Sequence, residues 1–484
     1  MSVFTFRYYI SQGMIVFLSA LAACVLPRAI ADDHYAAQNG QTPAGAYTTW
    51  ASAASNIQDA VNAATTNDTV WVGAGRYTVP PNATNFAGTN VVFINRPLTL
   101  RSSNGVPEST VIDGQATNRG VVFYYPNNTT NRLAIDGFTV SNCFATNIGG
   151  GILFYALERS WTGEVVNCII NDNIVAWGTN SEFSYHKTGS SGAGIGDFNN
   201  ACGFGLTVTN TIIRNNRALP RGEAFTDAGD GGAISHRSIY GEVLIKGCLI
   251  ESNEATMAAG FNNGGSHITI ENTVFRYNRA YTNGSGCSSF TPGGGAMEGG
   301  NFTLLNCLIY NNNAYRAGGI YITTGSNYFY NSTIVSNRSY SGAGGINMRF
   351  VTHANSAHLR IWNSIIYSNN IPNIQVDGFT NITPDGRLSL QITNSCFLTN
   401  SLSFATNFNL YAAGKGNITN NPRFVNFANE DFRLRYDSPC LNTGTNDDWM
   451  TNSADLDGRA RVRYGTVDMG AYELTYDGTV YMVK

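Results

Sequence analysis

A heptapeptide that recurs nine times is the feature that most constrains how this chain can fold. Each copy begins with Asn, Asp or Gly, carries apolar residues in its middle and ends in Asn, as in NCLIYNN and NSTIVSN. Successive copies start 25 to 43 residues apart, a period typical of stacked repeats. The copies start at Asp136, Asn167, Asn210, Gly247, Asn272, Asn306, Asn331, Asn363 and Asn394.

A second pattern, a small–Gly–small–apolar corner, lies between the heptapeptides. Examples are GGGI at Gly149 and AGGI at Ala317. The flanking segments are rich in β-branched residues, so each repeat should hold at least two short strands joined at glycine corners. Such a unit buries its apolar face only by stacking on copies of itself, which predicts parallel strands about 4.8 Å apart. We therefore predict an all-β chain that folds as a right-handed parallel β-helix, with its repeats over 131–421.

The Asn that ends every heptapeptide is expected to have a structural role. Asn tolerates the left-handed backbone of a tight bend, and its amide can bond to the same residue one repeat away. We predict a ladder of Asn side chains rather than a row of ligand-binding residues. The second heptapeptide position holds Cys in three copies and small residues in the others, so most cysteines are expected to be unpaired. Cys202 and Cys287, in longer loops, are the candidates for a disulfide.

One short helix is predicted near the start of the solenoid. In SNIQDAVNAA, the apolar residues between Ile57 and Ala64 recur at helical spacing behind a Ser or Asn that can cap the helix. We expect this helix to shield the open first coil from edge pairing. The cap and the first coils are assigned to 32–130, and a C-terminal coil and cap region to 422–484.

The first residues predict export. Residues 1–31 have the pattern of a secretory signal peptide, with Arg7 before an apolar run and AIA, ending at Ala31, as a cleavage site. A second interpretation is that LAAC is a lipoprotein box, which would leave a lipid anchor on Cys24. Both predict bacterial-type export and a secreted or cell-surface protein. No later apolar run is long enough to span a bilayer, so no transmembrane span is expected in the mature chain.

Composition excludes one class of partner. Only 13% of the residues are charged and the formal net charge is −3. Nucleic-acid binders depend on clusters of Lys and Arg that neutralise phosphates. We therefore expect no nucleic-acid partner.

Both ends of the chain resemble known families. YAAQNG, DTVWVGAGRY and PLTLRSSNG resemble the N-terminal region of secreted bacterial right-handed β-helix proteins of the pectin-lyase-like superfamily. ADLDGRARVRYGTVDMGAYEL, at Ala454 to Leu474, resembles the C-terminal region of choice-of-anchor Q proteins. FRYNRA and GGAI resemble the repeats of chlamydial polymorphic outer-membrane proteins. These resemblances imply a β-helix fold and export, but this fold hosts lyases, hydrolases, epimerases and adhesins.

Alternation along the strands predicts which side chains leave the core. When the Ile of each glycine corner points inward, the next residue and the third one point outward, while His236 points inward. The outward residues can stack on sugar rings and pair with hydroxyl or acidic groups. The first outward column is Leu153, Gly196, Ser235, Asn262, Glu298, Tyr321, Asn347 and Gln375, and the second is Tyr155, Phe198, Arg237, Gly264, Gly300, Thr323, Arg349 and Asp377.

Three long insertions are expected to lie beside these columns. They cover 173–191, 216–231 and 278–294, and each precedes a glycine corner, so they should gather on one side of the solenoid. The predicted site combines columns and insertions. Its catalytic residues are Glu298, Arg237 and Asp230, and its substrate-binding residues are Tyr321, Asn347, Arg349 and Tyr281.

Calcium is the one cofactor that the sequence suggests. Asp227 and Asp230 could supply oxygen ligands to a hard cation. Asp455 and Asp457, in DLDG, resemble a fragment of a calcium loop, but without the rest of that motif we interpret them as a turn paired with Arg459 or Arg461.

The sequence therefore predicts an exported β-helix protein that binds a polysaccharide or cell-surface glycan and can cleave it. A lyase needs a base, and a cation such as Arg237 or Arg349 for the substrate carboxylate. A glycoside hydrolase needs two carboxyl groups, for which Glu298 and Asp230 are available. The alternative is a non-catalytic cell-surface or adhesin-type protein, and the repeats alone do not separate the two.

Overall fold

The computed structural model describes most of the chain between Ala31 and Leu474, and the structural statements below concern these described residues. The predicted signal peptide up to residue 30, including Cys24, lies outside them. They are 31–80, 84–85, 88–125, 132–156, 161–176, 191–199, 203–219, 229–280, 293–349, 356–370, 372–377, 388–404 and 411–474.

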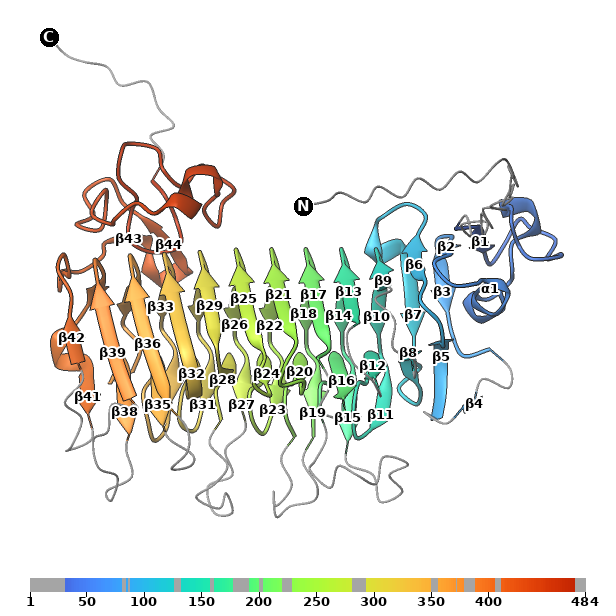
Figure 1. Ribbon diagram of the computed structural model, residues 1–484, viewed down its shortest axis with the longest axis horizontal. Helices are drawn as coiled ribbons and strands as arrows, with labels where there is room; N and C mark the ends of the chain where they lie inside the picture. The colour runs from blue at the N-terminus through green and yellow to red at the C-terminus, as the bar shows by residue number, and fades with distance from the viewer. Residues whose placement is uncertain are drawn as a thin grey trace, which may run out of the picture.

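Short strands follow one another around each coil, and the coils stack along the long axis of the molecule (Figure 1). One coil consists of β20 (Ile234–His236), β21 (Glu242–Lys246), β22 (Leu249–Glu251) and β23 (Glu254–Ala255). Each strand pairs in parallel with the equivalent strand of the next coil, as Ile234 does with Phe261. The predicted all-β fold, a parallel β-helix with a short N-terminal helix, is confirmed.

Stacked strands form four ladders. The first ladder is β5 (Gly88–Ile94), β8 (Arg119–Tyr125), β12 (Ile152–Ala156), β16 (Ile195–Asn199), β20, β24 (Phe261–Asn263), β28 (Met297–Gly300), β32 (Ile320–Tyr330), β35 (Ile346–Arg349), β38 (Ile374–Asp377) and β41 (Leu402–Phe404). The second is β1 (Asp33–Ala36), β2 (Thr69–Val72), β6 (Thr99–Ser102), β9 (Arg132–Asp136), β13 (Thr162–Val166), β17 (Gly205–Thr209), β21, β25 (His267–Glu271), β29 (Phe302–Leu305), the second half of β32, β36 (Ala357–Trp362), β39 (Leu388–Thr393) and β42 (Tyr411–Ala413).

The third and fourth ladders close the coil. The third is β3 (Gly75–Tyr77), β7 (Thr110–Asp113), β10 (Thr139–Ser141), β14 (Ile169–Asn171), β18 (Ile212–Arg214), β22, β26 (Val274–Arg276), β30 (Leu308–Tyr310), β33 (Thr333–Val335), β37 (Ile365–Tyr367) and β40 (Cys396–Phe397). The fourth is β11 (Phe144–Thr146), β15 (Ile174–Ala176), β19 (Arg217–Ala218), β23, β27 (Arg279–Ala280), β31 (Asn313–Ala314) and β34 (Arg338–Ser339). The ladders enclose one continuous core of Ile, Val, Leu and Phe side chains.

The predicted Asn ladder lies at the turn between the third and fourth ladders. From Asn173 to Asn337, each Nδ2 donates to the Oδ1 of the Asn in the next coil at 2.9–3.0 Å, and Asn369 Nδ2 extends the series by donating to Asn373 Oδ1 at 3.1 Å. These side chains are buried, so the bonds replace water for groups that would otherwise be unpaired. The ladder holds for seven of the nine heptapeptide copies.

The first and last copies depart from this pattern. Thr139 pairs with Ile169, which places Cys143 rather than Asn142 at the ladder position, and the Cys143 amide donates to Asn173 Oδ1 at 3.0 Å. At the other end, Asn400 is exposed in a 3₁₀ turn. The assignment of these two copies to the ladder is therefore wrong. The first copy is shifted by one residue relative to the others, and the last Asn lies in a 3₁₀ turn and not at a ladder position.

The left-handed backbone conformation occurs at the first and sixth heptapeptide positions and not at the seventh, which holds the ladder Asn. In the seven copies that form the ladder, the first position has positive φ, 55° at Asn306 for example, and so does the sixth, as at Tyr277 with 56°. No residue of the Asn ladder has positive φ. Different residues thus perform the two tasks that we assigned to one Asn: the first and sixth positions bend the chain at two successive turns, and the seventh bonds across coils.

The cysteines at the second heptapeptide position support a parallel row of bonds. The amide of Cys168 donates to Thr211 Oγ1 and that of Cys307 to Ser332 Oγ, both at 3.2 Å. All six described cysteines are buried and free, which confirms this prediction for the described chain. Cys202 and Cys287 lie outside it.

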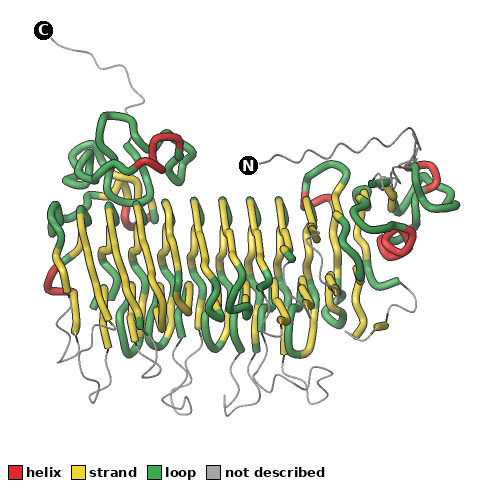
Figure 2. Tube along the Cα trace, in the orientation of Figure 1, coloured by secondary structure: helices red, strands yellow, loops and turns green. Residues whose placement is uncertain are grey.

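A single α-helix, α1 (Ile57–Ala63), packs against β1, β2 and β5 at the N-terminal end (Figure 2). Asn56 caps it, with its Oδ1 accepting from the Asp59 amide at 2.9 Å. Ile57, Ala60 and Val61 are buried, so the apolar face predicted from the sequence covers the first coil.

Residues 422–474, here called the C-terminal module, lie along the side of the last coils (Figure 1). The module contains the antiparallel pair β43 (Phe424–Asn426) and β44 (Asp431–Leu434). Phe432 and Met469 pack with Leu308, Ile365 and neighbouring side chains on the outside of the third ladder.

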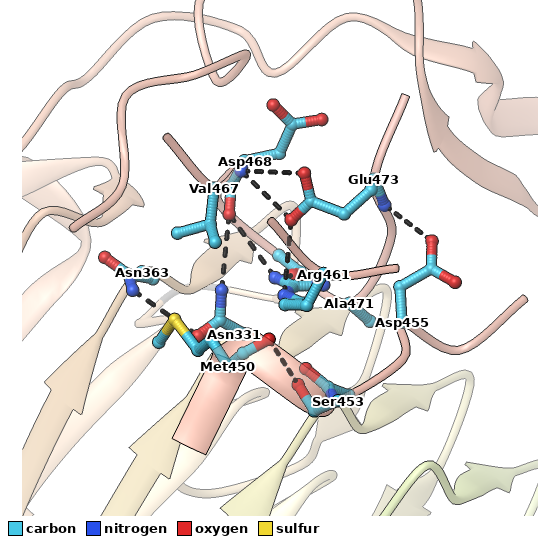
Figure 3. Close-up of polar contacts among 12 residues, drawn as sticks. Asn331, Asn363, Met450, Ser453, Asp455, Arg461, Val467, Asp468, Ala471 and Glu473 are labelled. Carbon is cyan, nitrogen blue, oxygen red and sulfur yellow. Dashed lines mark hydrogen bonds and ion pairs between the residues drawn. The ribbon is translucent and has the colours of Figure 1, made fainter. Parts of the chain in front are cut away.

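A buried arginine joins segments of the module to one another, and a neighbouring glycine bonds to the solenoid (Figure 3). Arg461 is fully buried, and its Nε lies 3.2 Å from Glu473 Oε1. The Glu473 amide donates to Asp455 Oδ2 at 2.7 Å. The Gly470 amide donates to the carbonyl of Asn363 in the solenoid at 2.7 Å. A buried guanidinium is tolerated because a carboxylate and backbone carbonyls surround it.

The remaining regular elements are short. β4 (Thr84–Asn85) pairs with β5 in antiparallel fashion, and 3₁₀ turns cover Trp50–Ser52, Pro107–Ser109, Thr399–Ser401, Phe427–Asn429 and Asp448–Asn452. None of the described helices is long and apolar enough to cross a membrane.

Candidate functional site

The first outward column has the register that the sequence predicts. Neighbouring coils pair its members one to one along the first ladder. The pairs are Leu153 with Gly196, Gly196 with Ser235, Ser235 with Asn262, Asn262 with Glu298, Glu298 with Tyr321, Tyr321 with Asn347, and Asn347 with Gln375.

This column points away from the core but is not exposed, which corrects the expectation of an open face. The exposed fraction is 7% for Glu298, 0% for Tyr321 and 1% for Asn347. The reason is the glycine corner, which folds back over the strand that follows it. At Gly231, with a φ of +62°, an added Cβ would lie 2.9 Å from the Cα of Ser235.

The second outward column is partly accessible and starts with aromatic rings. Tyr155 and Phe198 pair in register, and their rings stack with centroids 4.7 Å apart and planes 2° apart. Arg349 pairs with Asp377 as expected. A bulge after Gly299 makes Gly300 pair with Thr324, so the expected position of Thr323 in this column is wrong.

Arg237 and Asp230 form an ion pair at the edge of the first ladder. The Arg237 Nη2 lies 3.2 Å from Asp230 Oδ2 and donates to Ser191 Oγ at 2.6 Å. The side chains of Arg237 and Asp230 are 19% and 14% exposed. Burial raises the pKa of Asp230 to about 6, although the guanidinium partly offsets this rise. This carboxyl group can therefore change protonation at mildly acidic pH.

Glu298 is the second carboxyl group of the cluster. Burial raises its pKa well above the usual value, the negative charge of Asp230 raises it further, and the Gly294 amide and Arg316 oppose the shift. The atoms Glu298 Oε2 and Asp230 Oδ1 are buried and have no hydrogen-bond partner among the described residues. Buried polar atoms without a partner are uncommon in native proteins and ask for an explanation, such as a ligand. We call Asp230, Arg237, Ser235 and Glu298 the acid cluster.

Beneath the acid cluster, His236 points inward, as the alternation predicts. Its Nδ1 lies 2.5 Å from Asp197 Oδ2, and its Nε2 lies 2.9 Å from Ser266 Oγ. The other oxygen of Asp197 accepts from the Arg237 amide at 2.9 Å. Asp197 was not expected in the site, although the same alternation places it inward, two residues after the corner Ile195.

The other predicted site residues are distributed as follows. Asp227 and Tyr281 lie outside the described residues. The described residues contain no cluster of three or more His, Cys, Asp or Glu side chains that could hold a metal ion, so calcium at Asp227 and Asp230 stays a prediction.

The DLDG segment is a turn. Asp455 accepts from the amides of Asp457 and Arg459 at 3.0 and 2.8 Å. Asp457 is 3.6 Å from Arg459, as predicted, but its main partner is Arg433, at 2.7 and 2.8 Å.

An open groove that the sequence did not indicate lies on the second ladder. It has a volume of about 630 Å³ and crosses five strands from β13 to β29. Its lining mixes hydroxyl and amide groups with three aliphatic residues, and Glu242 and His267 are its titratable side chains. The signal was present as outward threonines: Thr207, Thr269 and Thr303 share one row with Leu244, and Thr162 lies in the neighbouring row.

No protein-family model and no curated protein matches the chain by sequence. Among solved structures, the chain is similar to a pectate lyase at 14% identity and a TM-score of 0.46, over 92% of this chain and 96% of that one. It is also similar to the A-module of a mannuronan C-5 epimerase from Azotobacter vinelandii at 14% identity and a TM-score of 0.36, over 70% and 81% of the two chains. At such identities, the similarity concerns the fold and not the activity.

Proposed function

We propose that this protein is exported, binds a polysaccharide and cleaves it by acid–base chemistry at the acid cluster. The observation that carries this proposal is the pair of buried carboxyl groups, Asp230 and Glu298, which act on each other electrostatically and both have raised pKa values. Groups with shifted pKa values that lie next to a specific charged partner are typical of catalytic acids and bases.

The arrangement suits hydrolysis better than elimination. Glu298, whose pKa is raised by burial and by Asp230, would hold a proton at neutral pH and could give it to the glycosidic oxygen. Asp230, kept partly ionised by Arg237, would take a proton from the attacking water. In a lyase, Arg237 or Arg349 would have to neutralise the substrate carboxylate, and the charge of Arg237, the one beside the acid cluster, is already shared with Asp230.

Two features outside the core support glycan binding. The half-buried ring of Tyr155 stacks on Phe198, which is only 6% exposed, in the same outward column as Arg237, and a partly exposed aromatic ring of this kind can stack on a sugar. The groove on the second ladder crosses five coils, and four of them supply hydroxyl or amide side chains, enough to follow an extended chain.

A second candidate is the non-catalytic cell-surface or adhesin-type protein. The near-complete burial of Glu298, Tyr321 and Asn347 favours it, because a substrate must reach an acid before it can be protonated.

One experiment separates these functions. The purified protein is incubated with neutral and uronic polysaccharides, and reducing ends and the absorbance of unsaturated products are recorded together. Hydrolysis should give reducing ends without absorbance, whereas elimination gives both. Binding without either signal contradicts the enzymatic proposal and favours the adhesin. Repeating the assay with a chelator tests the calcium prediction at Asp227 and Asp230.

A further inference from the structure

The first described strand begins next to a buried carboxylate. The Asp32 backbone nitrogen lies 2.9 Å from Asp68 Oδ1, to which it donates, and the Asp32 carbonyl accepts from the Thr69 amide at 3.0 Å. Asp68 is only 1% exposed, whereas Ala31 and Asp32 are exposed. The backbone of Asp32 is thus held on both sides, with its nitrogen directed at a buried acid.

Asp68 is ionised in this setting. Burial alone would raise its pKa, but hydrogen bonds from the Thr65 and Asp32 amides and from His34 bring it below its usual value. His34 Nε2 lies 3.1 Å from Asp68 Oδ2, and His34 Nδ1 lies 2.7 Å from the Ala46 carbonyl oxygen. Each ring nitrogen of His34 thus faces an oxygen atom, so the histidine is held between Asp68 and the Ala46 carbonyl.

The same nitrogen belongs to the bond that a signal peptidase would cut. The sequence AIA ends at Ala31 and has the small residues of a cleavage site. Hydrolysis adds water across the Ala31–Asp32 peptide bond: Ala31 leaves as a carboxylate, and the Asp32 nitrogen becomes an amine that takes up a proton.

We propose that the exported protein is processed between Ala31 and Asp32, and that the new α-ammonium group of Asp32 forms an ion pair with the buried Asp68 that fastens β1 to the first coil. An amide nitrogen offers one donor and no charge, whereas an ammonium group offers three donors and a full positive charge. The pocket should therefore hold the processed N-terminus more tightly than the amide of the precursor, which makes one uncharged hydrogen bond to Asp68. This inference is independent of the proposed glycan chemistry.

The ion pair predicts a defined pH window. A free α-amino group has a pKa of about 7.7–8.0, and Asp68 should raise this value in the folded state. The added stability is then complete below about pH 7.7 and is lost as the pH rises through the folded pKa. The titratable groups around the amine are Asp68, His34, the Asp32 side chain and Asp33, whose Oδ1 accepts from Trp71 Nε1 at 3.0 Å.

The test compares two proteins, one starting at Asp32 and one starting at Ala31, each released from a removable N-terminal fusion. The rate at which an amine-reactive ester labels the N-terminus of the folded protein is measured at pH 7 by mass spectrometry. One unit of pKa removes about nine-tenths of the free amine, so labelling should be about tenfold slower at Asp32 than at Ala31. The thermal midpoint should be higher for the Asp32 protein at pH 6 to 7, and this difference should vanish above about pH 10.

The variant Asp68→Asn should bring the labelling rate of the Asp32 protein to that of the Ala31 protein. If this variant does not fold, the comparison of the Asp32 and Ala31 proteins still tests the proposal, because both proteins keep Asp68. Equal labelling rates and equal midpoints in the two proteins would overturn the proposal. N-terminal sequencing of the protein exported by its host should give Asp32; a lipid-modified Cys24 at the N-terminus would also overturn it.

Discussion

Two buried polar columns run along this solenoid, and they differ in how their hydrogen bonds are satisfied. In the Asn ladder, the Nδ2 of Asn278 donates to Asn312, and that of Asn312 donates to Asn337, at 2.9 and 3.0 Å. In the first outward column, Ser235 Oγ and Glu298 Oε2 are buried without a hydrogen-bond partner among the described residues.

The difference follows from the side chains themselves. An amide carries both donors and acceptors, so a column of identical Asn residues satisfies itself at any length. A column that mixes carboxyl, hydroxyl and aromatic groups cannot, because an ionised carboxylate only accepts. Buried polar groups that lack some of their hydrogen bonds reduce the stability of the fold. They are typically kept where they have a function, such as binding a ligand. The Asn ladder is therefore structural, and the acid cluster is the candidate site.

The largest expected effect comes from replacing Glu298, the proposed proton donor, with a residue that has no acidic proton. Glu298→Gln keeps the size of the side chain and removes its proton-donating group. If the protein is a hydrolase, the rate should fall by about two to four decades while glycan binding persists. Initial rates of reducing-end release, together with binding isotherms, measure the two effects.

Glu254→Gln is the matched control, because Glu254 lies on the fourth ladder and pairs with Arg217. Its rate should stay within about twofold of the wild type, since exposed ion pairs contribute little to stability. Equal losses in both variants would show that Glu298 has no special role.

A substitution in the Asn ladder should lower the stability of the fold without changing the catalytic rate. Asn312→Leu removes a side chain that bonds to Asn278 and Asn337 and to backbone carbonyls of neighbouring turns. The expected loss is about 1–3 kcal/mol for each buried group left unpaired, measured by denaturant unfolding. Asn400→Leu changes the same heptapeptide position outside the ladder and should stay within about 0.5 kcal/mol. Equal effects would contradict the internal ladder.

The acid cluster should also appear in the pH dependence of stability. The folded pKa of Asp230, about 6, lies above its unfolded value of 3.8, so the native state binds the proton more tightly. Stability from this site is highest below about pH 4, falls as the pH rises to about 6, and stays low above it, by on the order of 1–3 kcal/mol. Asp230→Asn should flatten this part of the curve from thermal unfolding, and an unchanged slope would argue that Asp230 titrates normally.

The smallest expected effect concerns Tyr321. Because its ring is fully buried, removing the whole side chain would disturb the fold and not only binding. Tyr321→Phe removes just the hydroxyl group and should change stability by less than about 1.5 kcal/mol. If a glycan reaches this hydroxyl, its affinity falls by a similar amount in calorimetry; unchanged affinity would place the ligand elsewhere on the solenoid.

The sequence repeats predicted which residues of the first outward column pair with each other, but not whether their side chains are exposed to solvent. The pairing of Asn262 with Glu298 and of Glu298 with Tyr321 follows from strand alternation counted from the glycine corners. Their burial depends on how far each corner folds back, which the positive φ values at Gly149, Gly192 and Gly231 decide. The sequence shows that glycine at these corners can adopt a positive φ. It does not show which strand the corner will then cover.

The C-terminal module shows the same limit on a larger scale. The resemblance of Ala454 to Leu474 to a known C-terminal region marks these residues as a unit, but not where the unit packs. In the structure, Asn306 Nδ2 donates to the Ala454 carbonyl and Asn363 Nδ2 to the Thr445 carbonyl, both at 2.8 Å. The equivalent Asn167, several coils earlier, donates to Asp136 instead, so one motif position serves two purposes.

By itself, the sequence determined the stacking of the coils, the Asn ladder over most of its length, the inward turn of His236 and the capping helix. These are consequences of local repetition, because each residue meets the same position of the next coil. Tertiary structure alone decided which outward side chains are covered, that Asp230 pairs with Arg237, and that the amide of Asp32 points at Asp68. Those contacts join residues from non-equivalent positions, whose distance depends on how corners and ends fold in space.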